Sequence, residues 1–452
     1  MTVIHFGRAL LPDGWSSDVR VAIDADGRIA GVERGAKAEA DDERAAIGIP
    51  GVPNVHSHTF QRGMAGLAET RGPITDTFWT WRETMYRFAG AITPEDAEAI
   101  AAMAFVEMLE RGFTTVGEFH YLHHDRDGHE YSDIAEMAVR MASAAASTGI
   151  GMVLLPVFYA HSDFGGAPPE DHQKRFICDL DAFARLVEGA RRATSPLPGG
   201  RTGIAPHSLR AVTPDELDAL LPLAGDGPVH IHVAEQTREV EDCVAWCGTR
   251  PVAWLIDNQP LDQRWCAIHA THMTTPETSG LARSGATAGL CPVTEASLGD
   301  GFFPAVAWRE AGGHLGIGTD SNVLIGLADE LRQLECNQRL VTRSRNVLAE
   351  TGRSTGRSLF DAALAGGSAA LGLGEAGLAE GSITGVVSLE VEPSLLDSLE
   401  ADMLLDIWIF AGRARVDTVW RNGVRQVERG RHRHRATVER AFQTTMMRIL
   451  SA

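Results

Sequence analysis

Two histidines near residue 57 are spaced so that they could hold one metal ion between them. His56 and His58 follow the apolar run 49–53, Ile-Pro-Gly-Val-Pro. Because side chains alternate between the two faces of a strand, both imidazoles project from the same side, about 7 Å apart along the strand. Neutral imidazoles are good zinc ligands. A similar pair, His432 and His434, follows no apolar strand and lies among arginines, so we expect it in a solvated tail.

Three later segments repeat the pattern of an apolar run that leads to a ligand-type residue. His232 lies near the end of one run, and Glu235 follows it by three positions. His269 and Asp320 end two further runs. Three neutral imidazoles and one carboxylate suit zinc, with iron(II) as the alternative. The ligand set that we expect for one ion per chain is His56, His58, His232 and Asp320.

These residue types predict a hydrolytic reaction. A divalent ion held by them would lower the pKa of a bound water to near ~7 and so make hydroxide at cellular pH. Asp320 could accept a proton from that water, and Glu235 could pass a proton to a leaving nitrogen. His269 could polarise the substrate or orient the hydroxide. We therefore expect Glu235, His269 and Asp320 to be catalytic.

The composition limits the partners of this protein. Its 452 residues carry a formal net charge of −19, and 44% of them are hydrophobic. Nucleic acids and anionic membranes bind basic surfaces, so neither is an expected partner. A small anionic substrate would need a local pocket of positive charge in such a chain. Arginine must supply that charge, because the only lysines are Lys37 and Lys174.

The cysteines and the N-terminus favour a cytoplasmic location. The 6 cysteines are scattered and show no disulfide or zinc-finger spacing, so we expect them to be reduced. Residues 1–11 lack the pattern of an export signal. No apolar run approaches the ~20 residues that a membrane helix needs.

The elements that must position these residues alternate along the chain. Proline follows threonine at 94, 214 and 276, which indicates helix starts. Helical periodicity is clearest over 94–111, 132–148, 176–192 and 214–223. Strands are expected over 51–58, 114–119, 149–158, 203–205, 228–233, 265–269, 287–291 and 315–320. Eight strands separated by helices predict a (β/α)8 TIM-type barrel of the α/β class, whose chemistry lies at the carboxyl ends of the strands. A doubly wound sheet would not gather residues from strands one, five, six and eight around one point.

The two ends of the chain have a different pattern. Short strand-like runs occur at 19–23 and 28–32, and Asn422-Gly423 between alternating runs predicts a hairpin. We therefore expect a small β-sandwich from residues 1–49 and 375–430 beside a barrel formed by 50–374. Residues 431–452 would form a helical tail.

Longer motifs carry a family resemblance over essentially the whole chain. HxH on the first strand, HxxE on the fifth, His on the sixth and Asp on the eighth resemble the amidohydrolase superfamily. Neither lysine lies at a barrel strand end, so the branch with two metals bridged by a carboxylated lysine is excluded. The residues around these motifs are still more similar to those of the formimidoylglutamate deiminases. The matching stretches are 56–66, 78–83, 118–121 and 207–212.

This resemblance implies a substrate and a pocket. The implied reaction is zinc-dependent deimination of N-formimino-L-glutamate to N-formyl-L-glutamate and ammonia, in histidine degradation, by a homodimer. Arg82 and Arg210, in loops after the first and fourth strands, could make bidentate pairs with the two substrate carboxylates. By the same resemblance, the residues that bind the substrate are Gln61, Arg82, Tyr121, His207 and Arg210. Relatives often have histidine at Asn322, which puts a secondary contact in doubt.

Several alternatives stay open at this point. The same machinery could deaminate an aromatic base such as guanine or an adenosine-like compound, which would not need the two arginines. Hydrolysis of the same substrate could instead give formamide and glutamate. A metal-binding scaffold without catalysis is a third class, against which the intact Glu235 and His269 weigh. We expect His120, His123 and His124 to be solvated, and 78–81 to form a pocket wall.

Overall fold

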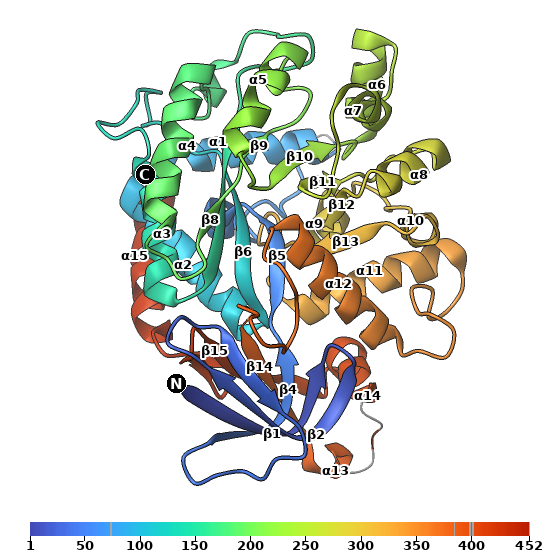
Figure 1. The fold of residues 1–452 in the computed structure, drawn as a ribbon. Helices are drawn as coiled ribbons and strands as arrows, with labels where there is room; N and C mark the ends of the chain where they lie inside the picture. The colour runs from blue at the N-terminus through green and yellow to red at the C-terminus, as the bar shows by residue number, and fades with distance from the viewer. Residues whose placement is uncertain (73–74, 384, 397–398, 400–401, 452) are drawn as a thin grey trace.

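A closed barrel of parallel strands forms the larger part of the molecule (Figure 1). The computed structural model describes residues 1–72, 75–383, 385–396, 399 and 402–451. The barrel strands are β5 (Val52–Ser57), β6 (Phe113–His120), β7 (Gly151–Phe158), β8 (Arg201–Thr202) with β9 (Ala205–Pro206), β10 (Val229–Val233), β11 (Trp265–His269), β12 (Thr287–Leu290) and β13 (His314–Ile317). β13 pairs with β5, and a bridge from Ile204 to Val229 joins the fourth strand position to the fifth. The predicted (β/α)8 architecture is therefore confirmed.

Helices between the strands cover the outside of the barrel. They are α1 (Phe78–Ala91), α2 (Pro94–Glu110), α3 (Glu136–Thr148), α4 (Leu180–Thr194), α5 (Pro214–Ala224), α6 (Thr237–Cys247), α7 (Pro251–Asn258), α8 (Thr275–Arg283), α9 (Pro292–Leu298), α10 (Ala305–Glu310), α11 (Leu327–Thr342) and α12 (Thr355–Ala370). Thr93 and Thr213 cap α2 and α5 as expected, because each side chain accepts a backbone N–H at the third helical position. At α8 the cap is Thr274, one residue before the expected threonine.

The two ends of the chain build a second sheet below the barrel. Its strands, in spatial order, are β17 (Arg431–His432), β16 (Val424–Glu428), β15 (Ala414–Arg421), β14 (Val386–Val391), β4 (Glu43–Pro50), β1 (Thr2–Leu11), β2 (Gly14–Ile23) and β3 (Ile29–Glu33). Phe6 of β1 contacts Trp420 of β15 with ring centroids 6.1 Å apart, although two strands separate them in the sheet. The sheet therefore curls around its own apolar core as the expected small β-sandwich. Asn422 and Gly423 form the predicted hairpin turn, both with positive φ.

The remaining helices lie at the edges of the molecule. They are α13 (Pro393–Leu396), α14 (Met403–Asp406), and the terminal α15 (Arg435–Ser451), which packs on α2. The expectation that His432 is solvated is wrong. His432 is buried, and its Nε2 donates to the carbonyl of Thr148 at 2.9 Å. No helix among the described residues is long and apolar enough to cross a membrane.

Candidate metal centre and active site

Four side chains meet at the carboxyl end of the barrel in a geometry that fits a metal ion. Asp320 Oδ1 lies 3.4 Å from His56 Nε2 and 3.3 Å from His58 Nε2. The Nε2 atoms of His56 and His232 are 3.1 Å apart. A tetrahedral site with bonds of about 2.0–2.1 Å has edges of about 3.3 Å between its ligand atoms. Three of the distances between the predicted ligands therefore match the edges of one tetrahedral site, and His232 also groups with His56 and His269.

The outer nitrogens of His58 and His232 are each held by a main-chain carbonyl. His58 Nδ1 donates to the carbonyl of Phe119 at 2.8 Å, and His232 Nδ1 donates to the carbonyl of His207 at 3.0 Å. With Nδ1 protonated, Nε2 of each ring presents a bare lone pair to the site. Burial lowers the pKa of His56 to about 3, and it lowers the pKa of His232 as well. Neutral imidazoles with converging lone pairs are the form that binds a cation.

The backbone around Asp320 is held by a buried polar network. The Asp320 N–H donates to the carbonyl of His56, and the His58 N–H donates to the carbonyl of Asp320. Asp320 and Asn322 both adopt positive φ. Asn322 is fully buried and donates through Nδ2 to Ser57 Oγ and to the carbonyl of Asp320. Asn322 therefore fixes the turn that aims Asp320, a contact that needs an amide donor.

Glu235 and His269 lie beside the four converging ligands. His269 Nε2 is 3.8 Å from Glu235 Oε1 and 3.8 Å from Asp320 Oδ2. Burial raises the pKa of Glu235 to about 7, so this carboxyl can both gain and lose a proton near neutral pH. Burial disfavours the charged form of His269, but the carboxylates of Glu235, Glu295 and Asp320 outweigh it and raise its pKa to about 10. Glu295 was missed in the sequence, because it comes four residues after a strand run and not at its end.

The substrate residues predicted from the sequence line one cavity above the ligand cluster. Gln61 Nε2 donates to Tyr121 Oη at 2.7 Å, and the Tyr121 hydroxyl donates to Met85 Sδ at 4.0 Å. His207 packs against Tyr159 in the same wall. Arg210 is buried, and neither its Nε nor Gln61 Oε1 has a hydrogen-bond partner among the described residues. Both residues line the cavity, and buried polar atoms without a partner call for an explanation, which a bound polar group would supply.

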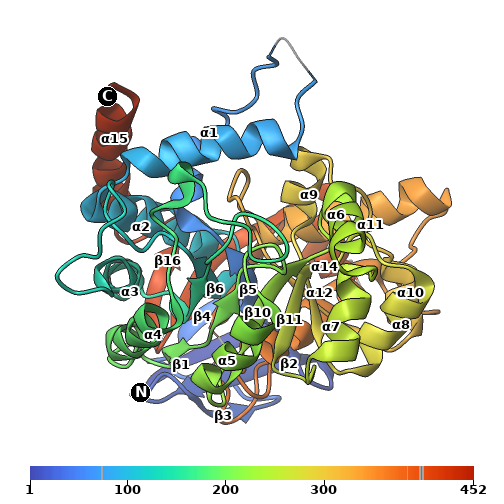
Figure 2. The ribbon, with the colours of Figure 1, turned by 90° about the horizontal axis from the view of Figure 1, so that it is seen from above.

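Arg82 reaches the cavity from helix α1 and not from the loop that we expected. In the view of Figure 2, α1 lies along one side of the barrel. Arg82 Nε donates to Tyr86 Oη at 2.7 Å, and Arg82 Nη2 donates to Tyr159 Oη at 3.2 Å. Phe78 and Trp81 line the cavity as the expected pocket wall. One helix thus carries both the wall and a cation.

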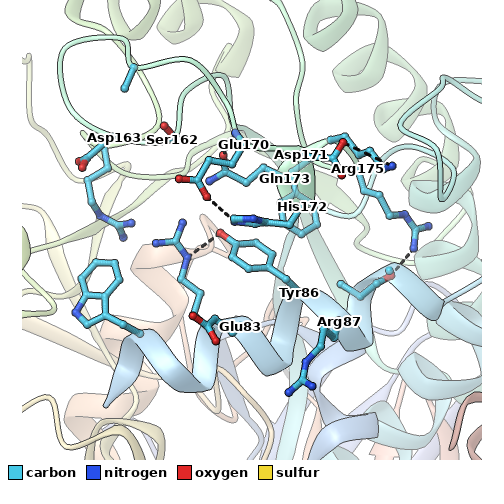
Figure 3. Close-up of a pocket in the computed structure, with 18 of the residues that line it drawn as sticks. Glu83, Tyr86, Arg87, Ser162, Asp163, Glu170, Asp171, His172, Gln173 and Arg175 are labelled. Atoms are coloured by element: carbon cyan, nitrogen blue, oxygen red, sulfur yellow. Dashed lines mark hydrogen bonds and ion pairs between the residues drawn. The ribbon is translucent and has the colours of Figure 1, made fainter. Parts of the chain in front are cut away.

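A larger open chamber lies outside this cavity. It has a volume of about 1060 Å³ and is shown in Figure 3, where Tyr86 and His172 lie ring to ring. The residues that line both the chamber and the inner cavity are Arg82, Tyr86, Phe176 and Arg210. The two cations therefore stand where the outer chamber meets the inner cavity.

The expectation that the histidines after β6 are solvated is wrong. His120, His123 and His124 are all buried. His123 Nε2 donates to the carbonyl of Val157, and His124 Nε2 donates to the carbonyl of Ile177. These bonds tie the loop that begins with Tyr121 to its neighbours, so these histidines support the cavity wall.

Removal of one proposed ligand tests the metal centre. We expect His232→Ala to abolish stoichiometric binding of zinc. The variant would keep only three of the four proposed ligands, and it would lose the one whose tautomer the His207 carbonyl fixes. The measurement is the metal content per chain after dialysis. The wild type and His434→Ala, which changes a histidine outside the site, are the controls. Full zinc occupancy in His232→Ala would show that another residue is the ligand.

Comparisons with known proteins agree with this arrangement. Residues 47–425 match the model of the amidohydrolase family, and residues 1–46 match the N-terminal domain of formimidoylglutamate deiminase HutF. The formimidoylglutamate deiminase of Pseudomonas aeruginosa is 47% identical over 453 residues, which cover 100% of both chains. A 5-methylthioadenosine/S-adenosylhomocysteine deaminase of Natronomonas pharaonis is 28% identical over 78% of this chain and 74% of its own. The crystal structure of an amidohydrolase from Brucella melitensis has a TM-score of 0.97 and 58% identity, with 100% of each chain covered.

Proposed function

This chain belongs to the amidohydrolase family, and we propose that it hydrolyses N-formimino-L-glutamate to N-formyl-L-glutamate and ammonia. The observation that carries the proposal is that a single cavity holds the metal-ligand cluster together with two arginine side chains, Arg82 and Arg210. In a linear substrate, two carboxylates would match the two arginines and one amidine-like carbon would match the metal-ligand cluster. The full-length similarity to a formimidoylglutamate deiminase supports the same substrate.

Zinc is the ion that we propose for this centre, with iron(II) as the second candidate. His56, His58, His232 and Asp320 would hold it, since their donor atoms have the spacing of a tetrahedral site. When bound, the ion supplies Lewis acidity that makes water nucleophilic at neutral pH.

The protein groups around the centre would manage the protons of the reaction. Water adds to the formimino carbon, the bond from that carbon to the terminal nitrogen breaks, and the nitrogen leaves as ammonia. Glu235 would take a proton from the attacking water and deliver it to the departing nitrogen, a task that a carboxyl of pKa about 7 suits. His269 and Asp320 would together orient the attacking oxygen.

The cavity walls would bind the glutamate part of the substrate. Arg210, with its unpaired Nε, and Arg82, held by two tyrosines, would each pair with a carboxylate. Gln61, Tyr121 and His207 would add neutral hydrogen bonds and exclude water. The buried Arg210 and the half-buried Arg82 would also offset the repulsion of a dianion by a protein of net charge −19.

Ammonia release from a panel of substrates tests the proposed function. The zinc-loaded protein should release ammonia from N-formimino-L-glutamate and not from guanine or adenosine, because an aromatic base leaves both arginines unpaired. If the protein released ammonia from a base and none from formiminoglutamate, the proposed metal site would stand and the proposed substrate would be wrong.

Three further proposals concern the setting of the reaction and rest on the family resemblance. We propose that the enzyme acts in histidine degradation, in the cytoplasm, and as a homodimer. Sedimentation of the purified protein tests the dimer, and a monomer at micromolar concentration would exclude it.

A further inference from the structure

A buried glutamate stands behind His269, on the side away from the metal ligands. Glu295 lies on α9 and is only 4% exposed. Its Oε1 accepts the Nδ1–H of His269 at 3.2 Å and the backbone N–H of Cys291 at 2.8 Å. The same carboxylate oxygen therefore joins the start of α9 to the imidazole.

The contact decides which way the imidazole of His269 is presented. His269 lies at the end of β11 and adopts a positive φ. With Nδ1–H held by Glu295, Nε2 must face the opposite side, where Glu235 Oε1 and Asp320 Oδ2 each lie 3.8 Å away. His269 Nε2 is therefore near both Glu235, the proposed proton carrier, and Asp320, a proposed metal ligand.

We infer that Glu295 is a positioning residue that fixes the orientation of the His269 imidazole for the attacking oxygen. The inference rests on the proposed function for its effect on turnover. A carboxylate suits this role better than a neutral acceptor, since a charge-assisted hydrogen bond is shorter and about twice as strong. A simple helix cap would need only the bond to Cys291.

Glu330 provides a matched control within the same helix environment. It is a fully buried glutamate that accepts the backbone N–H of Val293 in α9 at 2.8 Å. In the described part of the chain, its hydrogen bonds include none to His269. Glu330→Gln therefore alters a buried carboxyl at α9 without touching the imidazole, and it should leave kcat within about twofold of the wild type.

The kinetic test is Glu295→Gln, which keeps an oxygen acceptor for Cys291 and removes the charge. We expect kcat on N-formimino-L-glutamate to fall about 10- to 100-fold, the range seen when an outer carboxylate partner is lost. KM should change by less than about twofold, because Glu295 does not line the cavity that binds the substrate. An unchanged kcat, or a loss equal to that of Glu330→Gln, would overturn the role.

A spectroscopic test needs no substrate and no variant of Glu295. In ¹⁵N-histidine-labelled wild type, His269 should give a downfield Nδ1 proton resonance, assigned by its loss in His269→Asn. Protonation at Nε2 with a bare Nδ1 would overturn the inference even if the protein folds and turns over normally. If the wild type releases no ammonia from formiminoglutamate, the proposed function fails, and this resonance still decides the role of Glu295.

Discussion

Replacement of Glu235 by glutamine should lower kcat by about 10²- to 10⁴-fold while the metal stays bound, the range that general acid–base catalysis contributes. The amide has the shape of the carboxyl but cannot take a proton from water or deliver one to the leaving nitrogen. Glu235 is not among the four converging ligands, so metal content should equal that of the wild type. Turnover of formiminoglutamate and metal analysis on the same preparation measure both.

A buried glutamate elsewhere in the barrel controls for damage to the fold. Glu277 completes the capping box of α8 with Thr274 and pairs with Arg250, and it does not line the cavity. Glu277→Gln should keep kcat within about twofold of the wild type. Near-normal kcat in Glu235→Gln would remove Glu235 from the proton path, whatever the metal content.

Replacement of Arg210 by methionine should raise KM for formiminoglutamate by about 30- to 1000-fold, since loss of one partner of a buried charge pair costs about 2–4 kcal/mol. Arg210 is 5% exposed and its Nε is unpaired among the described residues, so the substrate carboxylate would be its missing partner. Methionine preserves the length of the aliphatic part and removes the guanidinium. Steady-state kinetics over a wide substrate range separates KM from kcat.

An exposed arginine of the outer chamber is the matched control for this variant. Arg238 lies over the ring of Trp79 and pairs with Asp242 in a solvated position. Arg238→Met should change KM by less than about threefold, because exposed charges are screened by water and salt. Equal KM values for the Arg210 and Arg238 variants would contradict a carboxylate site at Arg210.

The barrel and the ligand cluster could be predicted because strand ends are visible in a sequence. His56, His232, His269 and Asp320 each follow an apolar run, and parallel strands of a barrel bring such ends to one rim. Glu295 gives no such signal, since its contact with His269 is tertiary and joins residues of two different strand–helix units.

The helix that carries Arg82 was missed for a local reason. Its start is a capping box between Thr77 and Thr80, and threonine at the third position is a weaker sign than glutamate or glutamine. The aromatic residues that follow suggested core or a pocket wall, and Arg82 was expected in a loop. The structure shows that a helix can present that wall.

The burial of several histidines could not be predicted from the polarity of their neighbours in the sequence. His123, His124 and His432 look solvated beside charged neighbours, yet each donates to a main-chain carbonyl in the interior. One such bond satisfies the single N–H donor of a neutral imidazole. The partner is a backbone group, which no side-chain pattern reveals.

Identification of the products from N-formimino-L-glutamate tests the central claim most directly. Mass spectrometry of a single-turnover reaction in H₂¹⁸O should find ammonia and N-formyl-L-glutamate with ¹⁸O in its formyl group. That label requires water to add at the formimino carbon and the terminal nitrogen to leave. Formamide and glutamate as products would contradict the account, since the proton would then have reached the other nitrogen.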